Sequence, residues 1–272
     1  NLLEEKQRVE EELNQINNQS SLTNIPQKNL NQISLTLQEN LPKIDFDKAM
    51  KVVDQKLDGF GQELGETIFF LENTHPMAGE LCICRIKENL NNYTGTLRPL
   101  PVGITHSSSR NEFGILESLA KYVEVNREFA DDIIKYSQEI IGGICKSLQT
   151  GSVIFITINK WNYLEPQDKV ISWFLEKFWS HLIEKTYKTI QEKDLRQVKI
   201  IAIINAESKL SPKDRKLLLG NDSVTKIPLV KWAERDINKW LASYSSCLSQ
   251  KGLSGSEIDF LARDIHSKTE RG

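Results

Sequence analysis

The sequence lacks the features of a membrane, disulfide-stabilised or nucleic-acid-binding protein. No apolar run approaches the roughly 20 residues that a membrane-spanning helix needs, and the first residues do not resemble a signal peptide. The four cysteines form no CxxC pair or Cys/His cluster with metal spacing. A net charge of −2 and a pI near 6.2 give no basic footprint for nucleic acid. We therefore expect a cytoplasmic protein with reduced thiols, no metal, and neither membrane nor nucleic acid as a partner.

The composition changes along the chain and indicates a linker followed by a domain. Residues 1–18 are charged, with apolar side chains at helical spacing, and residues 17–41 are rich in Asn, Gln, Ser and Thr. We therefore assign residues 1–41 to a helical and polar linker segment. Residues 42–272 are assigned to one folded domain, because strands and helices alternate from there on.

This alternation predicts the fold class. The β-branched runs at 67–71, 152–158 and 198–204 predict buried strands. A segment with two prolines at 98–104 suits an edge strand, and a shorter strand is expected near 226–229. Helices are expected at about 45–57, 79–90, 111–122, 127–148, from 166 onward, 231–249 and 254–267. Near-continuous apolar strands separated by helices predict a three-layer α/β fold with a mostly parallel five-stranded sheet.

The segment after the first strand has the layout of a phosphate-binding loop without its charged residue. The strand at 67–71 and the loop at 73–78 lead to Gly79, which opens a helix, as in the motif G-x-x-x-x-G-K-[ST]. Glu80 stands where that motif has Lys. A carboxylate is compatible with the positive end of a helix dipole, but it repels a phosphate at the same place. The pattern therefore indicates an NTPase scaffold that has lost its activity.

Two later strands end without the acidic residues that serve Mg²⁺ and water in active P-loop enzymes. Asn159 and Lys160 follow one strand, and Lys160 would oppose a divalent ion. Asn205 follows the next, where such enzymes often sense the γ-phosphate, although ordinary loop chemistry is the favoured interpretation. His75 lies in the loop, where exposure to solvent is the favoured interpretation. The predicted remnant of a nucleotide site consists of His75, Gly79, Glu80, Asn159 and Asn205, with no catalytic residue and no cofactor.

The stretch from Phe70 to Ile86 resembles the first strand and degenerate loop of the inactive STAND group. These proteins are catalytically inactive relatives of the signal-transducing, multidomain NTPases. In that group Gln or Glu follows the loop Gly, as in Gly79-Glu80 here. Residues 113–120 resemble its second helix, and residues 227–241 its closing strand and helix. The resemblance covers roughly residues 45–250.

The resemblance implies both a fold and a function. It implies a P-loop NTPase-like domain with strand order 5-1-4-3-2, and a role in bacterial conflict and defence systems as a sensor or scaffold rather than a catalyst. We therefore expect a non-catalytic regulatory or scaffold module that relays partner recognition to an effector. Its expected partners are protein effector or sensor domains in the same or a neighbouring chain.

Three alternatives stay open. The domain could bind nucleotide without hydrolysis and act as a switch, because backbone amides at a helix N-terminus can hold phosphate without Lys. It could be an enzyme of another α/β type, although no convergent Asp, His, Ser or Cys set appears at the strand ends. It could also be an oligomerisation module driven by the N-terminal helix, so an oligomer is possible.

Two further patterns lie in the last third of the chain. The charged segment Lys209–Lys216 lies where related ATPases can present an arginine finger, but without a phosphate site a solvated face is expected. Trp232 and Trp240 are eight residues apart in the expected closing helix, so they would share a face. Such a face is usually core, and an interaction face is the alternative.

Overall fold

A computed structural model of the chain describes residues 46–73, 79–93, 96–104, 109–125, 132–230, 232–243, 254–256, 258–260 and 262–263. The described residues divide into two compact units, one within Asp45–Ala233 and one within Glu234–His266. The linker expected over residues 1–41 lies outside the described residues. The boundary at residue 41 therefore stays a prediction.

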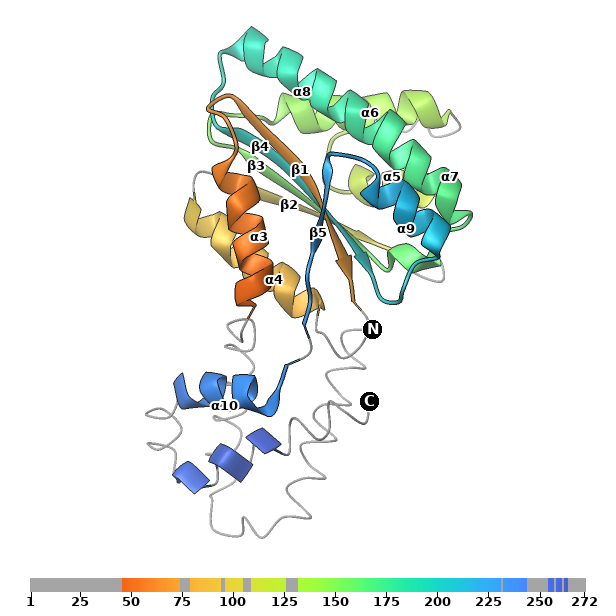
Figure 1. Ribbon diagram of the computed structural model, residues 1–272. Coiled ribbons are helices and arrows are strands. Elements are labelled where there is room, and N and C mark those ends of the chain that lie inside the picture. The colour runs from red at the N-terminus through yellow and green to blue at the C-terminus, as the bar shows by residue number, and fades with distance from the viewer. Residues whose placement is uncertain are drawn as a thin grey trace. The chain divides into compact units, whose positions relative to one another are not determined.

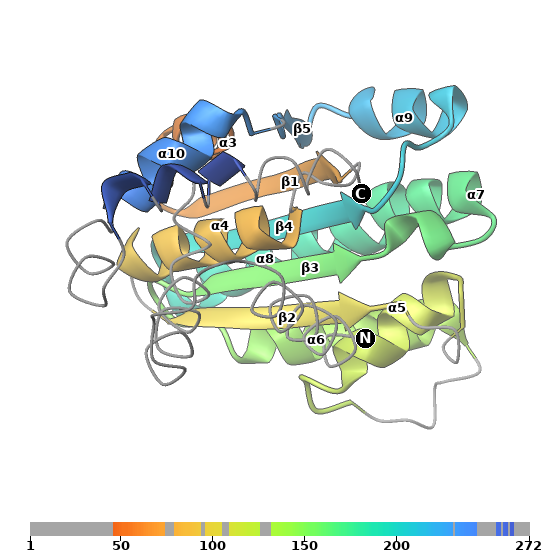
Figure 2. The same ribbon diagram turned by 90° about the horizontal axis from the view of Figure 1, so that it is seen from below.

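A five-stranded sheet forms the centre of the larger unit. Its strands are β1 (Leu64–Glu72), β2 (Leu97–Gly103), β3 (Val153–Asn159), β4 (Val198–Ala206) and β5 (Val224–Ile227). They lie in the order β2-β3-β4-β1-β5, and every neighbouring pair is parallel (Figure 2). Read from the other edge this order is 5-1-4-3-2, so the predicted strand order is confirmed.

The central strands form where the sequence is apolar on both sides of the pleat. β1 and β4 pair over nine residues, from Leu64 opposite Val198 to Glu72 opposite Ala206. Consecutive side chains of a strand point to opposite faces, and neighbours such as Phe69 and Phe70 are both fully buried. Helices therefore cover both faces, as expected for a parallel sheet. β2 lies at one edge, which confirms the edge strand predicted from its prolines.

Helices flank the sheet in two layers (Figure 1). On one face lie α3 (Asp47–Asp58) and α4 (Gly79–Tyr93). The opposite face carries α5 (Glu112–Ala120), α6 (Ile133–Lys146), α7 (Gln167–Ser172) and α8 (Ser180–Lys193), and α9 (Pro212–Leu219) lies beside β5. The predicted three-layer α/β architecture is confirmed.

The helix predicted from residue 166 onward contains an unusual central turn. Between α7 and α8 the chain forms a π-helical segment, η4 (Trp173–Trp179), whose aromatic side chains pack into the core. Phe174 and Phe178 stack at a ring distance of 5.7 Å, and Trp161 meets Phe174 edge-on at the same distance. Trp161 belongs to a short 3₁₀ helix, η3 (Trp161–Tyr163), directly after β3. The end of β3 is thus anchored in the aromatic core.

The smaller unit contains α10 (Glu234–Ser243), whose buried residues are Ile237, Trp240 and Leu241. The helix begins later than the predicted residue 231, because Trp232 and Ala233 are not helical. Trp232 belongs to the larger unit, where it packs edge-on against Phe46 at 5.6 Å. The prediction that Trp232 and Trp240 share a helical face is therefore wrong.

Candidate functional site

The predicted remnant residues gather at the carboxyl edge of the sheet. Gly79 and Glu80 are the first two residues of α4, and Asn159 is the last residue of β3. Asn205 lies within β4, which continues to Ala206, so the interpretation of Asn205 as a loop residue is wrong. His75 lies outside the described residues.

Asn159 and Asn205 form a side-chain pair between neighbouring strands. The Nδ2 of Asn205 donates to the Oδ1 of Asn159 at 3.1 Å. Asn205 is 1% exposed, and its Oδ1 has no hydrogen-bond partner, whereas Asn159 is half-buried. Ile158 and Ile204 belong to the core on the face of α5 to α8, so the next residues of both strands point to the face of α3 and α4. This pair is uncharged and carries no carboxylate for a divalent ion.

The side chain of Asn73 binds the first backbone amide of α4. Its Oδ1 accepts a hydrogen bond from the backbone N–H of Gly79 at 3.1 Å. A Cβ at position 79 would lie 2.9 Å from the Cβ of Asn73, so this close approach requires glycine. Free N–H groups at a helix N-terminus are what a phosphate binds. The sequence interpretation missed Asn73, although an Asn before a helix is a common partner for such amides.

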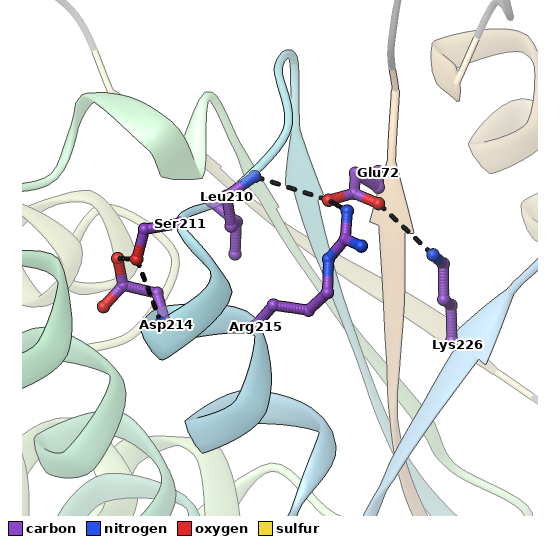
Figure 3. A network of polar contacts seen from close by, with 6 residues as sticks. All are labelled: Glu72, Leu210, Ser211, Asp214, Arg215 and Lys226. Atoms are coloured by element: carbon purple, nitrogen blue, oxygen red, sulfur yellow. Dashed lines mark hydrogen bonds and ion pairs between the residues drawn. The ribbon is translucent and has the colours of Figure 1, made fainter.

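The side chain before Asn73 points to the other face and is charged. Glu72 accepts from the guanidinium of Arg215 and from the Nζ of Lys226 at 3.2 Å (Figure 3). The Leu210 N–H also donates to Glu72, at 3.3 Å. The Glu72 side chain is only 7% exposed, so two cations from α9 and β5 converge on one buried carboxylate. We name Glu72, Arg215 and Lys226 the ion cluster.

The ion cluster sets the charge state of Glu72. Burial acts to raise the pKa of Glu72, but the hydrogen bonds and positive charges of Arg215 and Lys226 outweigh it and hold the pKa below its ordinary value. Ser211 caps α9 and orients the cluster's helix, because its Oγ accepts from the Asp214 N–H at 3.1 Å (Figure 3). The prediction that Lys209–Lys216 is simply a solvated face is thus wrong for Arg215.

Lys160, which was expected to oppose a metal ion, adopts a left-handed backbone with φ of 62° directly after β3. Its Nζ lies 4.0 Å from the carboxylate of Glu207, just beyond the end of β4. Among the described residues no group of three or more His, Cys, Asp or Glu is arranged to hold a metal ion. The Lys160 ammonium after β3 therefore lies beside the Glu207 carboxylate after β4.

The described cysteines and the surface cavities offer no further reactive site. Cys82 and Cys145 are buried, Cys84 is exposed, and burial raises the pKa of Cys82 to about 12, which keeps its thiol protonated and unreactive. Depressions of about 330 and 490 Å³ lie at α6 with α8 and at the amino-terminal side of β1. Neither is lined by a residue of the predicted remnant. No helix in the described ranges has the length and apolar character to cross a membrane.

Comparison with known sequences and structures gives one family and several distant folds. The sequence model of the inactive STAND family matches residues 41–204. No curated protein matches the chain. Similar solved structures include Cdc6p from Pyrobaculum aerophilum, with a TM-score of 0.44 and 12% identity, over 89% of this chain and 56% of that one.

Two further structures are similar at a lower level. The ORC1 protein of Aeropyrum pernix, solved in complex with DNA, gives a TM-score of 0.38 and 12% identity over 83% of this chain and 59% of that one. PCH-2 from C. elegans gives a TM-score of 0.32 and 13% identity over 76% of this chain and 47% of that one. The chain thus spans between about half and three fifths of the length of these structures.

Proposed function

Since the chain belongs to the inactive STAND family, we propose that it is a non-catalytic regulatory or scaffold module that relays partner recognition to an effector. Family membership assigns a non-catalytic NTPase-like domain, and the relay role extends that assignment. The proposed partners are protein effector or sensor domains in the same or a neighbouring chain. The proposed setting is a bacterial signalling or defence protein.

The observation that carries this proposal is the occupied amide at the beginning of α4. The Gly79 N–H, which a phosphate oxygen would need, already donates to Asn73. Glu80 adds a carboxylate to the same helix turn, where it repels a phosphate group. One amide that a phosphate would use is thus occupied by the chain's own Asn73, and this supports a domain whose state depends on protein contacts.

The far side of the same edge supports the proposal as well. An NTPase needs an acidic residue for Mg²⁺ near the γ-phosphate. Here Asn205 and Asn159 pair through their amides, and the nearby Lys160 brings a positive charge to the end of β3. A divalent ion would meet two neutral amides and a carboxylate, Glu207, that already lies beside the Lys160 ammonium, so these residues give metal-assisted hydrolysis little support.

Isothermal titration calorimetry on the full chain tests the non-catalytic part of the proposal. ATP and GTP, each with and without Mg²⁺, should give no binding heat at millimolar concentration. A micromolar Kd for either nucleotide would overturn it and favour a nucleotide-binding switch that does not hydrolyse. The matched variant Glu80→Lys removes the repelling carboxylate. If this variant binds nucleotide and the wild type does not, the proposal is supported, because the loss of nucleotide binding is then due to Glu80.

The relay part is tested by coexpression with the domains encoded beside the chain in its natural protein or operon. We expect one of them to copurify in a stoichiometric complex, and its activity to change when the complex forms. Purification of the chain without any of these domains would contradict the relay role.

A further inference from the structure

Two consecutive residues at the end of β1 hold two different parts of the fold. Glu72 points to the α9 side and accepts hydrogen bonds from Leu210, Arg215 and Lys226. Asn73 points to the α4 side and accepts from Gly79. We name these two residues the β1 step.

The contacts of Glu72 fix it firmly to elements far away in sequence. Its partners are 138, 143 and 154 residues later in the chain. A carboxylate that is 7% exposed cannot leave these partners without losing its compensating charges. The position of Glu72 therefore depends on the positions of α9 and β5, and the reverse is also true.

Asn73 has equally little freedom. Its Oδ1 is bound to the Gly79 N–H, and its own N–H donates to the Ala206 carbonyl at 2.7 Å, where β4 ends and the chain turns toward α9. Its Cβ packs so closely on Gly79 that no side chain fits between them. Consecutive Cα atoms are about 3.8 Å apart across a rigid planar peptide. Asn73 therefore cannot move far unless Glu72 moves as well.

We infer that the β1 step couples the beginning of α4 to α9 and β5, so that a partner displacing one of these parts loosens the other. The coupling passes through two adjacent residues: Glu72, the last residue of β1, is bound by charged groups, and Asn73, directly after the strand, accepts from the backbone amide of Gly79. β5 ends at Ile227, and in the sequence the boundary between the two units follows at Ala233. This inference goes beyond the proposed function and does not depend on it.

Hydrogen exchange on the full chain, read by mass spectrometry, tests the coupling without any partner. Asn73→Ala removes one hydrogen bond of about 1 kcal/mol, so exchange in the first turn of α4 should rise about fivefold. The coupling predicts that α9 and β5 also exchange faster in this variant, by about twofold or more. In the reciprocal variant, Glu72→Gln, exchange should rise in α9 and β5 and again in the first turn of α4.

Matched variants separate coupling from general destabilisation. Asn73→Asp keeps the accepting oxygen and should leave α4 and α9 protected as in the wild type. Asp168→Asn breaks an exposed ion pair between α7 and Lys213 of α9, and should leave α4 unchanged. Exchange in α6, which contacts neither residue of the β1 step, serves as the internal reference.

The inference is overturned if each substitution raises hydrogen exchange only in the element that its own residue contacts. If Asn73→Ala raises the exchange rate in α4 alone, and Glu72→Gln raises it in α9 and β5 alone, the two contacts are independent. If Glu72→Gln does not fold, the response of α9 to Asn73→Ala decides by itself. Because no nucleotide or partner is present, failure here is distinct from nucleotide binding in the calorimetric experiment.

Discussion

The two sides of the carboxyl end of β1 use opposite chemistry for the same task. On the α9 side, a buried carboxylate is held by two cations from two other elements. On the α4 side, the neutral amides of Asn73, Asn159 and Asn205 make all the side-chain contacts described above. The charges on the α9 side thus hold elements together, whereas the hydrogen-bonding side chains on the α4 side are neutral amides beside the carboxylate of Glu80. A charged cluster at a strand end is therefore not by itself a sign of catalysis.

The largest difference between the two sides should appear when the cations are removed. The double variant Arg215→Met, Lys226→Met leaves Glu72 buried without a counter-charge, so we expect the free energy of unfolding to fall by about 3 kcal/mol. Urea denaturation followed by tryptophan fluorescence measures this loss.

Two controls identify the buried charge as the cause. Adding Glu72→Leu to the double variant should restore most of the lost stability, because no unpaired charge is then buried. Lys213→Met, which breaks the exposed pair with Asp168, should cost less than about 1 kcal/mol. Equal losses in the double variant and in Lys213→Met would contradict the burial argument.

A smaller effect is expected on the amide side. Asn159→Ala removes the acceptor of the buried Asn205 Nδ2, and Asn205 already has an unpartnered Oδ1, so we expect a loss of about 2 kcal/mol in thermal unfolding. Replacing both residues by Leu leaves no orphaned polar group and should cost less than the single substitution. A larger loss in the double variant would show that the amides contribute more than their mutual hydrogen bond.

The smallest effect is expected from pH. The pKa of Glu72 lies below its ordinary value of 4.5, so its ionised form stabilises the folded state. This contribution is fully present at neutral pH and is lost as the pH falls below 4.5 through the lower pKa of the folded state. Stability should therefore fall less steeply below pH 4.5 in Glu72→Gln than in the wild type, as measured by urea denaturation across pH. Identical slopes would exclude Glu72 as a contributor to acid sensitivity.

The sequence predicted the sheet well because its central strands are buried on both faces. Such strands leave continuous apolar runs, as at Ile200–Ile204, which are easily distinguished from helices with one apolar stripe. Their ends are harder to predict. The apolar run ends at Ile204, but β4 continues to Ala206, whose carbonyl accepts from the N–H of Asn73 directly after β1.

The site residues that are close in sequence were predicted, and those that meet only in the fold were not. Gly79 and Glu80 were found because a strand, a loop and a helix follow one another in sequence. The ion cluster was missed because Glu72 lies more than 140 residues before Arg215 and Lys226, and no local pattern reports such a contact. Trp232 was placed in a helix because the apolar spacing continues through it, although the helix begins at Glu234.

The prolines of β2 have a consequence for assembly. Pro99 and Pro101 are exposed on a strand that pairs on one side with β3. Proline has no N–H to donate, so a strand from another molecule finds no donor at these two positions. This edge of the sheet is therefore a poor template for the addition of a strand from another molecule. Two residues that contribute nothing to the site thus keep the β2 edge of an apolar, parallel sheet from acting as a template for aggregation.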